Sequence, residues 1–184
     1  FEKLVKNSKY LKRKNEIKKF NNKNKIKKRG IAITPVKFGI SFTTIHLNQA
    51  GALVHLYTDG SVYLNHGGIE MGQGTHTKIA QVVANSLGLP YEKVKISSTN
   101  TTKVPNTSAS AASSTTDLNA AAALNATSKI KKNLEKFIKD KFKIFSKEEP
   151  IYKNESIIFG NRSFEFKKIV MEAYLNRVSL SSSG

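Results

Sequence analysis

The spacing of apolar side chains changes along the chain and predicts a mixture of helices and strands. Residues 2–28 contain neither Gly nor Pro and carry apolar side chains at loosely helical spacing, which predicts a surface helix. Gly30 follows three basic residues and predicts the end of that helix. β-Branched and aromatic residues then alternate around Pro35, so we expect strands at residues 31–33 and 37–42.

The centre of the chain predicts a hairpin and then a helix. Apolar runs at residues 52–57 and 62–64 flank Thr58-Asp59-Gly60-Ser61, and an Asp-Gly pair between such runs is a strong hairpin signal. Apolar residues return at helical spacing over residues 79–87, and Gly88 predicts the end of that helix.

The remaining segments continue this mixture of elements. Short strands are expected at residues 94–97 and 157–159, and residues 177–180 predict the start of another. An Ala-rich helix with a clear apolar stripe is expected over residues 117–142, and a last helix near residues 164–176. The pattern indicates an α+β fold class, with mixed or antiparallel strands and packed helices.

The formal net charge of +18 raises the question of a polyanionic partner. Residues 1–29 hold 13 lysines and arginines against two acids, residues 30–128 hold five against four, and residues 129–184 hold 13 against seven. Charge that gathers on predicted helices at the two ends is typical of solvated helix faces. We therefore expect no nucleic-acid and no membrane partner, and keep as an alternative a basic module that binds anions or nucleic acid.

Composition narrows the kinds of site that the chain can hold. The absence of cysteine excludes disulfides, thiolate zinc sites and iron–sulfur ligation within these residues. The four histidines, at positions 46, 55, 66 and 76, are too scattered for a familiar metal site, so no protein metal ligand is expected. No apolar run approaches the roughly 20 residues that span a bilayer. We expect an intracellular protein, cytoplasmic or peroxisomal, and a chain that is cut at both ends.

Two segments carry candidate chemistry. The first is His66-Gly67-Gly68-Ile69-Glu70-Met71-Gly72-Gln73-Gly74-Thr75, a glycine-rich turn between a predicted strand and a predicted helix. Its glycines allow backbone N–H groups to approach a bulky ligand, and the helix start behind it favours an anion. The segment matches neither the P-loop nor the dinucleotide-binding pattern, and a purely structural turn is an open alternative.

The second segment, residues 104–117, is rich in Ser, Thr and Ala and leads into another predicted helix start. Small side chains permit close approach of a ligand, and hydroxyl groups supply hydrogen-bond donors and acceptors. A flexible linker with a helix cap is the structural alternative.

Several motifs, in this order and spacing, resemble the xanthine dehydrogenase family of molybdenum hydroxylases. The resemblance is dense from about residue 28 to residue 125 and returns at residues 173–181. It rests on Lys37-Phe38-Gly39-Ile40-Ser41-Phe42, Leu47-Asn48-Gln49-Ala50-Gly51-Ala52-Leu53, Tyr57-Thr58-Asp59-Gly60-Ser61-Val62, the glycine-rich turn and Val104-Pro105-Asn106-Thr107-Ser108.

The resemblance implies an incomplete molybdopterin-binding domain over residues 1–184, the start of the second such subdomain of the family. Its expected parts are a basic N-terminal helix (1–29), a cofactor-loop core (30–128) and a helical or mixed C-terminal part (129–184). By position, the residues expected to contact the cofactor are Gly68, Met71, Gly72, Gln73, Gly74, Ser110, Ala111, Ala112, Ser113 and Thr115.

The resemblance also implies a larger enzyme that hydroxylates hypoxanthine and xanthine to urate. It would use a molybdenum–molybdopterin cofactor here, with FAD and 2Fe–2S clusters in its other regions, and would be a homodimer. The family's catalytic glutamate lies in a Gly-Glu-Pro context that does not occur in this chain, so we expect no catalytic residue here, and Glu70 to shape the cofactor loop instead. An aldehyde oxidase-type hydroxylase and a gene remnant without independent function stay open, and the chain alone is expected to be inactive.

Overall fold

The computed structural model describes residues 1–103, 107–145 and 149–184, and the chain divides into two units, Phe1–Gly39 and Ile40–Gly184. The subdivision expected at residues 29 and 128 stays a prediction. The elements in chain order are α1 (Glu2–Asn7), α2 (Tyr10–Lys23), η1 (Ile45–Leu47), β1 (Ala52–Leu56), β2 (Val62–His66), α3 (Thr75–Leu87), η2 (Tyr91–Lys93), β3 (Val94–Ile96), α4 (Thr115–Phe142), β4 (Ile151–Lys153), β5 (Ser156–Phe159), β6 (Arg162–Glu165), α5 (Phe166–Leu175) and β7 (Ser181–Ser183).

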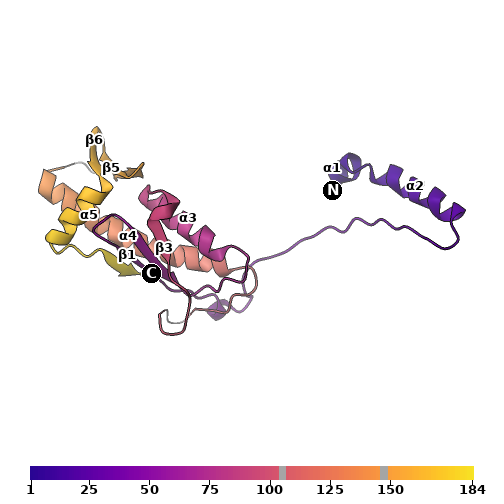
Figure 1. The fold of residues 1–184 in the computed structure, drawn as a ribbon, viewed down its shortest axis with the longest axis horizontal. Helices are drawn as coiled ribbons and strands as arrows, with labels where there is room; N and C mark the ends of the chain where they lie inside the picture. Colours follow the sequence, from indigo (N-terminus) through magenta and orange to yellow (C-terminus); the bar gives the residue numbers. More distant parts are fainter. Residues whose placement is uncertain (104–106, 146–148) are drawn as a thin grey trace. The chain divides into compact units, whose positions relative to one another are not determined.

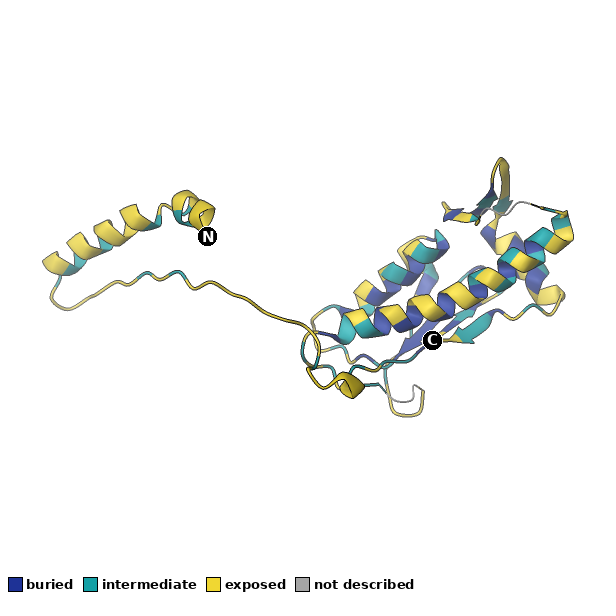
Figure 2. Ribbon diagram, turned by 180° about the vertical axis from the view of Figure 1, so that it is seen from behind, coloured by how far each residue is buried: buried dark blue, intermediate teal, exposed yellow. Residues whose placement is uncertain are grey.

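The first unit holds two short helices where one long helix was expected, and neither has a buried residue (Figure 2). The helix breaks at Lys9, whose φ of 52° lies in the left-handed region. It also ends at Lys23, before the predicted stop at Gly30, and the Asn21 side chain binds the chain that returns beyond the helix. The Asn21 Oδ1 accepts the Arg29 N–H at 2.8 Å, and its Nδ2 donates to the Arg29 carbonyl at 2.9 Å.

The strands expected at residues 31–33 and 37–42 are wrong, because residues 31–42 form neither helix nor strand in the structure. A strand is stable only when its backbone groups pair with a neighbour, and Pro35 lacks an N–H to donate. None of the strand pairings in the described part of the chain involves this segment.

The second unit is built on a four-stranded mixed sheet with the order β3-β2-β1-β7. The β1–β2 hairpin is confirmed, with Val54 opposite Leu64, and β3 adds parallel to β2. The last strand, β7, adds antiparallel to β1, with Val54 also opposite Ser182. The expected strand start at 177–180 lies just before β7. The α+β class with mixed strands is confirmed.

Helices α3 and α4 pack together over one face of this sheet (Figure 1). Alternate residues of β1 are buried, which is the pattern of a sheet with one covered face. The core between the layers includes Val54, Leu64, Ile79, Val83 and Ile130, each with 0% exposure. The predicted end of α3 at Gly88 is confirmed, and α4 begins two residues before the helix predicted over residues 117–142 and ends with it, since its apolar stripe is long and regular.

The end of α3 is fixed by Gly88, as the sequence predicted. Gly88 has a φ of +65°, and a Cβ atom there would lie 2.4 Å from the Lys153 backbone nitrogen. The close approach lets the Gly88 carbonyl accept the Glu155 N–H at 2.8 Å. In this way α3 is tied to a second, antiparallel sheet with the order β4-β5-β6, which leads into α5.

Within the described ranges, every helix is too short or too polar to cross a lipid bilayer.

Candidate functional site

The glycine-rich turn between β2 and α3 folds around the Glu70 carboxylate. Its Oε1 accepts the N–H groups of Gly72 at 2.8 Å and Gly74 at 2.9 Å, and its Oε2 accepts the N–H of His76 at 2.9 Å. The donors at His76, Gly74 and Gly72 lower the pKa of the Glu70 carboxyl to about 2. The carboxylate therefore occupies the Gly74 and His76 N–H groups at the start of α3, which supports the expected shaping role of Glu70.

The start of α3 was expected to favour an anion, and the Glu70 carboxylate supplies one from within the chain. Binding of an anionic ligand at this helix start stays a prediction.

The Gln73 side chain is also committed to the turn. Its Oε1 accepts the Met71 N–H at 2.6 Å, and its Nε2 donates to the Ile69 carbonyl at 2.8 Å. These two bonds hold residues 69–73 in one tight loop. Both polar ends of the Gln73 side chain are therefore bonded within the loop.

The second candidate segment is strained just before α4. Ala112 and Ser113 have φ values of 52° and 53°, in the left-handed region that non-glycine residues rarely adopt. Each such residue costs on the order of 1 kcal/mol and persists where the surroundings require it, which is common at functional sites. The Ser41 N–H donates to the Ala112 carbonyl at 3.1 Å and helps to fix this conformation.

Hydrogen bonds and close packing bring the two segments together. The Ile69 N–H donates to Ser110 Oγ at 2.8 Å, and the Thr75 and Thr116 hydroxyl oxygens lie 3.5 Å apart. Gly68 packs directly against the first turn of α4, where a Cβ atom on it would lie 2.8 Å from Thr115 Cγ2. The starts of α3 and α4 therefore lie side by side.

A cavity of about 440 Å³ opens where these two helix starts meet. Lys78 is the charged side chain in its lining, and its Nζ donates to the Gln73 carbonyl at 3.1 Å. The other lining residues are small, hydroxyl-bearing or uncharged. The lining consists of Met71, Gln73, Thr75, Lys78, Ser110, Ala111, Ala112, Ser113, Thr115 and Thr116.

The structure thus gathers most of the residues that the resemblance singled out. Met71, Gln73, Ser110, Ala111, Ala112, Ser113 and Thr115 all line the cavity, whereas Gly68, Gly72 and Gly74 do not. Thr75, Lys78 and Thr116 were not among the expected cofactor contacts, although Thr75 and Thr116 lie within the two candidate segments. Helical spacing alone places Lys78 one turn after Thr75, but which face of that turn meets the other segment is set by packing. Cofactor contact by the ten predicted residues stays a prediction, and residues 104–106 of the second segment lie outside the described residues.

A buried histidine supports the base of the glycine-rich turn. His66 is fully buried at the end of β2, and its Nδ1 accepts the Gly68 N–H at 3.1 Å. Burial lowers the pKa of His66 to about 4, with a smaller contribution from His76, whose ring packs edge-on at 4.9 Å. A neutral ring that accepts at Nδ1 carries its proton on Nε2. Among the described residues, no three metal-binding side chains come together.

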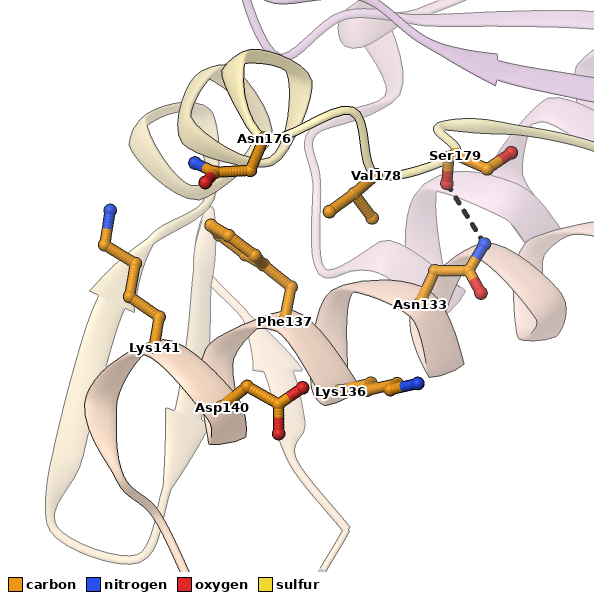
Figure 3. Close-up of a pocket in the computed structure, with 8 residues that line it drawn as sticks. All are labelled: Asn133, Lys136, Phe137, Asp140, Lys141, Asn176, Val178 and Ser179. Atoms are coloured by element: carbon orange, nitrogen blue, oxygen red, sulfur yellow. Dashed lines mark hydrogen bonds between the residues drawn. The ribbon is translucent and has the colours of Figure 1, made fainter.

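A larger cavity, of about 650 Å³, lies elsewhere, between α4 and the connection from α5 to β7 (Figure 3). Several of its polar side chains have partners within the chain. Asn133 Nδ2 donates to the Ser179 carbonyl at 3.1 Å, and Lys141 pairs with Glu172 at 3.0 Å. Because the two candidate segments do not line it, we place the functional site at the smaller cavity.

Comparison of the sequence with known families and proteins gives a consistent result. The model of a family described as molybdopterin cofactor-binding domain matches residues 3–184. Xanthine dehydrogenase/oxidase of Rattus norvegicus is 47% identical over 180 residues, and that of Felis catus is 48% identical over 184 residues. These alignments cover 98% and 100% of this chain, but the chain spans only 12% of the length of either relative.

Solved structures share the fold at lower sequence identity. A reconstituted CO dehydrogenase from Oligotropha carboxidovorans superposes with a TM-score of 0.66 and 21% identity, over 74% of this chain and 18% of that one. Quinoline 2-oxidoreductase from Pseudomonas putida 86 superposes with a TM-score of 0.68 and 19% identity, over 73% of this chain and 18% of that one.

Proposed function

Because this chain belongs to the molybdopterin cofactor-binding domain family, we propose that its cavity between the starts of α3 and α4 forms one wall of the cofactor site. The observation that carries the proposal is the convergence of the two candidate segments, far apart in sequence, on that one cavity. Hydrogen bonds within the chain hold both segments in place.

The residues present fit a pterin cofactor with a phosphate group. Among the described residues, no carboxylate lines the cavity, so none of its lining side chains repels an anion. Small residues at 111–113 let a ligand approach the backbone, and the α4 start offers free N–H groups, because Ser114 makes no side-chain cap there. When bound, the molybdenum cofactor would supply the redox centre, while this chain binds and orients it.

The proposal extends to the protein of which this chain is a part. The close relatives are named xanthine dehydrogenase/oxidase, so we propose that the parent protein, meaning the longer protein that carries this chain, oxidises a purine such as hypoxanthine or xanthine. FAD and 2Fe–2S clusters would lie in its other regions, and by the same resemblance it would be a cytoplasmic or peroxisomal homodimer. The catalytic base would lie outside this chain, which would be inactive alone.

Cofactor content of the purified parent protein tests this proposal. Replacing Gln73 with Ala removes both side-chain bonds that order the glycine-rich turn, so we expect the molybdenum content per protein to fall several-fold. Gln81→Ala is the matched control, since Gln81 is an exposed residue of α3 outside the cavity lining. Equal molybdenum and pterin contents in the wild type and both variants would contradict a cofactor role for this cavity.

A further inference from the structure

Lys78 is the charged side chain in the cavity lining, and nothing in the family resemblance singled it out. We propose that Lys78 is an anion-binding residue of this cavity, where its ammonium group contacts the phosphate of the bound pterin cofactor. The inference rests on the proposed function, since it names how the same cavity recognises its ligand.

The path of the Lys78 side chain places its charge at the cavity. Side chains on a helix point back toward its N-terminus, and Lys78 follows this rule by running over Gly74, where a Cβ atom would lie 3.9 Å from the Lys78 Cε. Its Nζ then donates to the Gln73 carbonyl at 3.1 Å. An ammonium group has three N–H donors, so further donors remain for a ligand.

The Lys78 ammonium group lies at a position where an anion would be stabilising. A cation near the start of a helix is disfavoured, because the helix dipole places partial positive charge there. The Glu70 carboxylate offsets part of this charge, but it is already bonded to three backbone N–H groups. Among the described residues Lys78 has no salt-bridge partner.

A second helix start adds to the positive potential at the same cavity. Thr115 and Thr116 of the first α4 turn line the same cavity as Lys78, and the Thr116 hydroxyl oxygen lies 3.5 Å from that of Thr75. Lysine, hydroxyl groups and helix N–H groups are the donors that proteins use for phosphate. The lining therefore favours the phosphate end of a ligand over a neutral or cationic group.

The test uses the parent protein with its cofactor, in the wild type and the variants Lys78→Met, Lys78→Arg and Lys132→Met. Lys132 is the matched control, because it is an exposed lysine of α4 that does not line the cavity. Molybdenum per protein is measured by mass spectrometry and released pterin by fluorescence, at a series of KCl concentrations. Thermal unfolding followed by circular dichroism verifies that each variant is folded.

We expect Lys78→Met to lose the cofactor roughly 10- to 100-fold faster at low salt, which corresponds to one charge-assisted hydrogen bond. Its release should also depend less on salt than that of the wild type, because the screened charge is gone. Lys78→Arg and Lys132→Met should release at nearly the wild-type rate.

Two results would overturn the inference while the proposed function stands. One is a cofactor-loaded wild type with unchanged release in Lys78→Met. The other is faster release in Lys78→Met with the full wild-type salt dependence, which would mean that Lys78 only holds the Gln73 carbonyl. A folded wild-type parent protein without molybdenum or pterin would instead refute the proposed function, and the role of Lys78 with it.

Discussion

Replacing Gly68 with Ala should separate the two segments of the cavity. The new Cβ would lie 2.8 Å from Thr115 Cγ2, and 3.2 Å from both Asn119 Nδ2 and His66 Nδ1. Carbon atoms in contact prefer about 3.5–4.0 Å, so the first turn of α4 must move. Overpacking of this kind costs about 1–3 kcal/mol.

An opposing effect acts in the unfolded chain. Alanine has less backbone freedom than glycine, which favours folding by about 0.4–1 kcal/mol where the native backbone tolerates it. Gly68 has no positive φ, so this gain applies in full. The steric effect is the larger of the two, and we expect a net loss of about 0.5–2 kcal/mol in the free energy of unfolding.

The double variant Gly68→Ala/Thr115→Ser tests the cause, since serine lacks the Cγ2 atom that is struck first. Urea unfolding of the chain and its variants, compared at constant m-value, gives the stability differences. Thr115→Ser alone should cost under about 1 kcal/mol, and the coupling between the two sites should be about 0.5–2 kcal/mol. A double variant no more stable than Gly68→Ala would show that this contact does not set the spacing of the two segments.

Three further outcomes can be checked by the same unfolding assay. Gly88→Ala combines a positive φ with a Cβ 2.4 Å from the Lys153 backbone, so it should destabilise the chain by more than about 2 kcal/mol, and an effect below 0.5 kcal/mol would contradict the tight contact. Leu134→Ala, at a fully buried position of α4, should cost about 2–5 kcal/mol, whereas the exposed Lys136→Ala should cost under about 0.5. The pKa of His66 is lowered to about 4 in the folded chain, from about 6.5 when unfolded. Between these two pH values the unfolded chain therefore binds one more proton, on His66, than the folded chain does. Stability should therefore decline across that window, by at most about 3 kcal/mol, and His66→Asn should flatten the decline; an equal decline in both proteins would refute this role.

The sequence predicted the hairpin turn and the end of α3, because each depends on a few neighbouring residues. The Asp59-Gly60 turn fixed the hairpin, with Asp59 Oδ1 accepting the Ser61 N–H at 2.8 Å, and Gly88 marked the end of α3. Residues 31–42 also alternate like a strand, but strand formation depends on a partner that the segment itself does not specify. The three serines of β7 carry no strand signal, and they pair because β1 offers a free edge.

The site was predictable to a similar extent. The resemblance identified both segments, because their small and glycine residues lie in contiguous motifs. Lys78 and Thr116 were not predicted as cofactor contacts. Their position in the cavity lining depends on how α3 and α4 cross, which the sequence of neither helix specifies alone. The strain at Ala112 and Ser113 was likewise invisible, because alanine and serine are common in ordinary helices and loops.

The pairing of β1 with β7 joins Val54 to Ser182, residues 128 positions apart in the chain. Contacts between such distant residues form slowly, because a long loop must close before they stabilise the fold. At about 5–20 residues per second, a ribosome needs roughly 6–26 s to make the intervening chain. During that time the outer edge of β1 has no partner strand and can pair with another nascent chain. The sheet on which the cavity is built is therefore most open to misassembly while the protein is still being made.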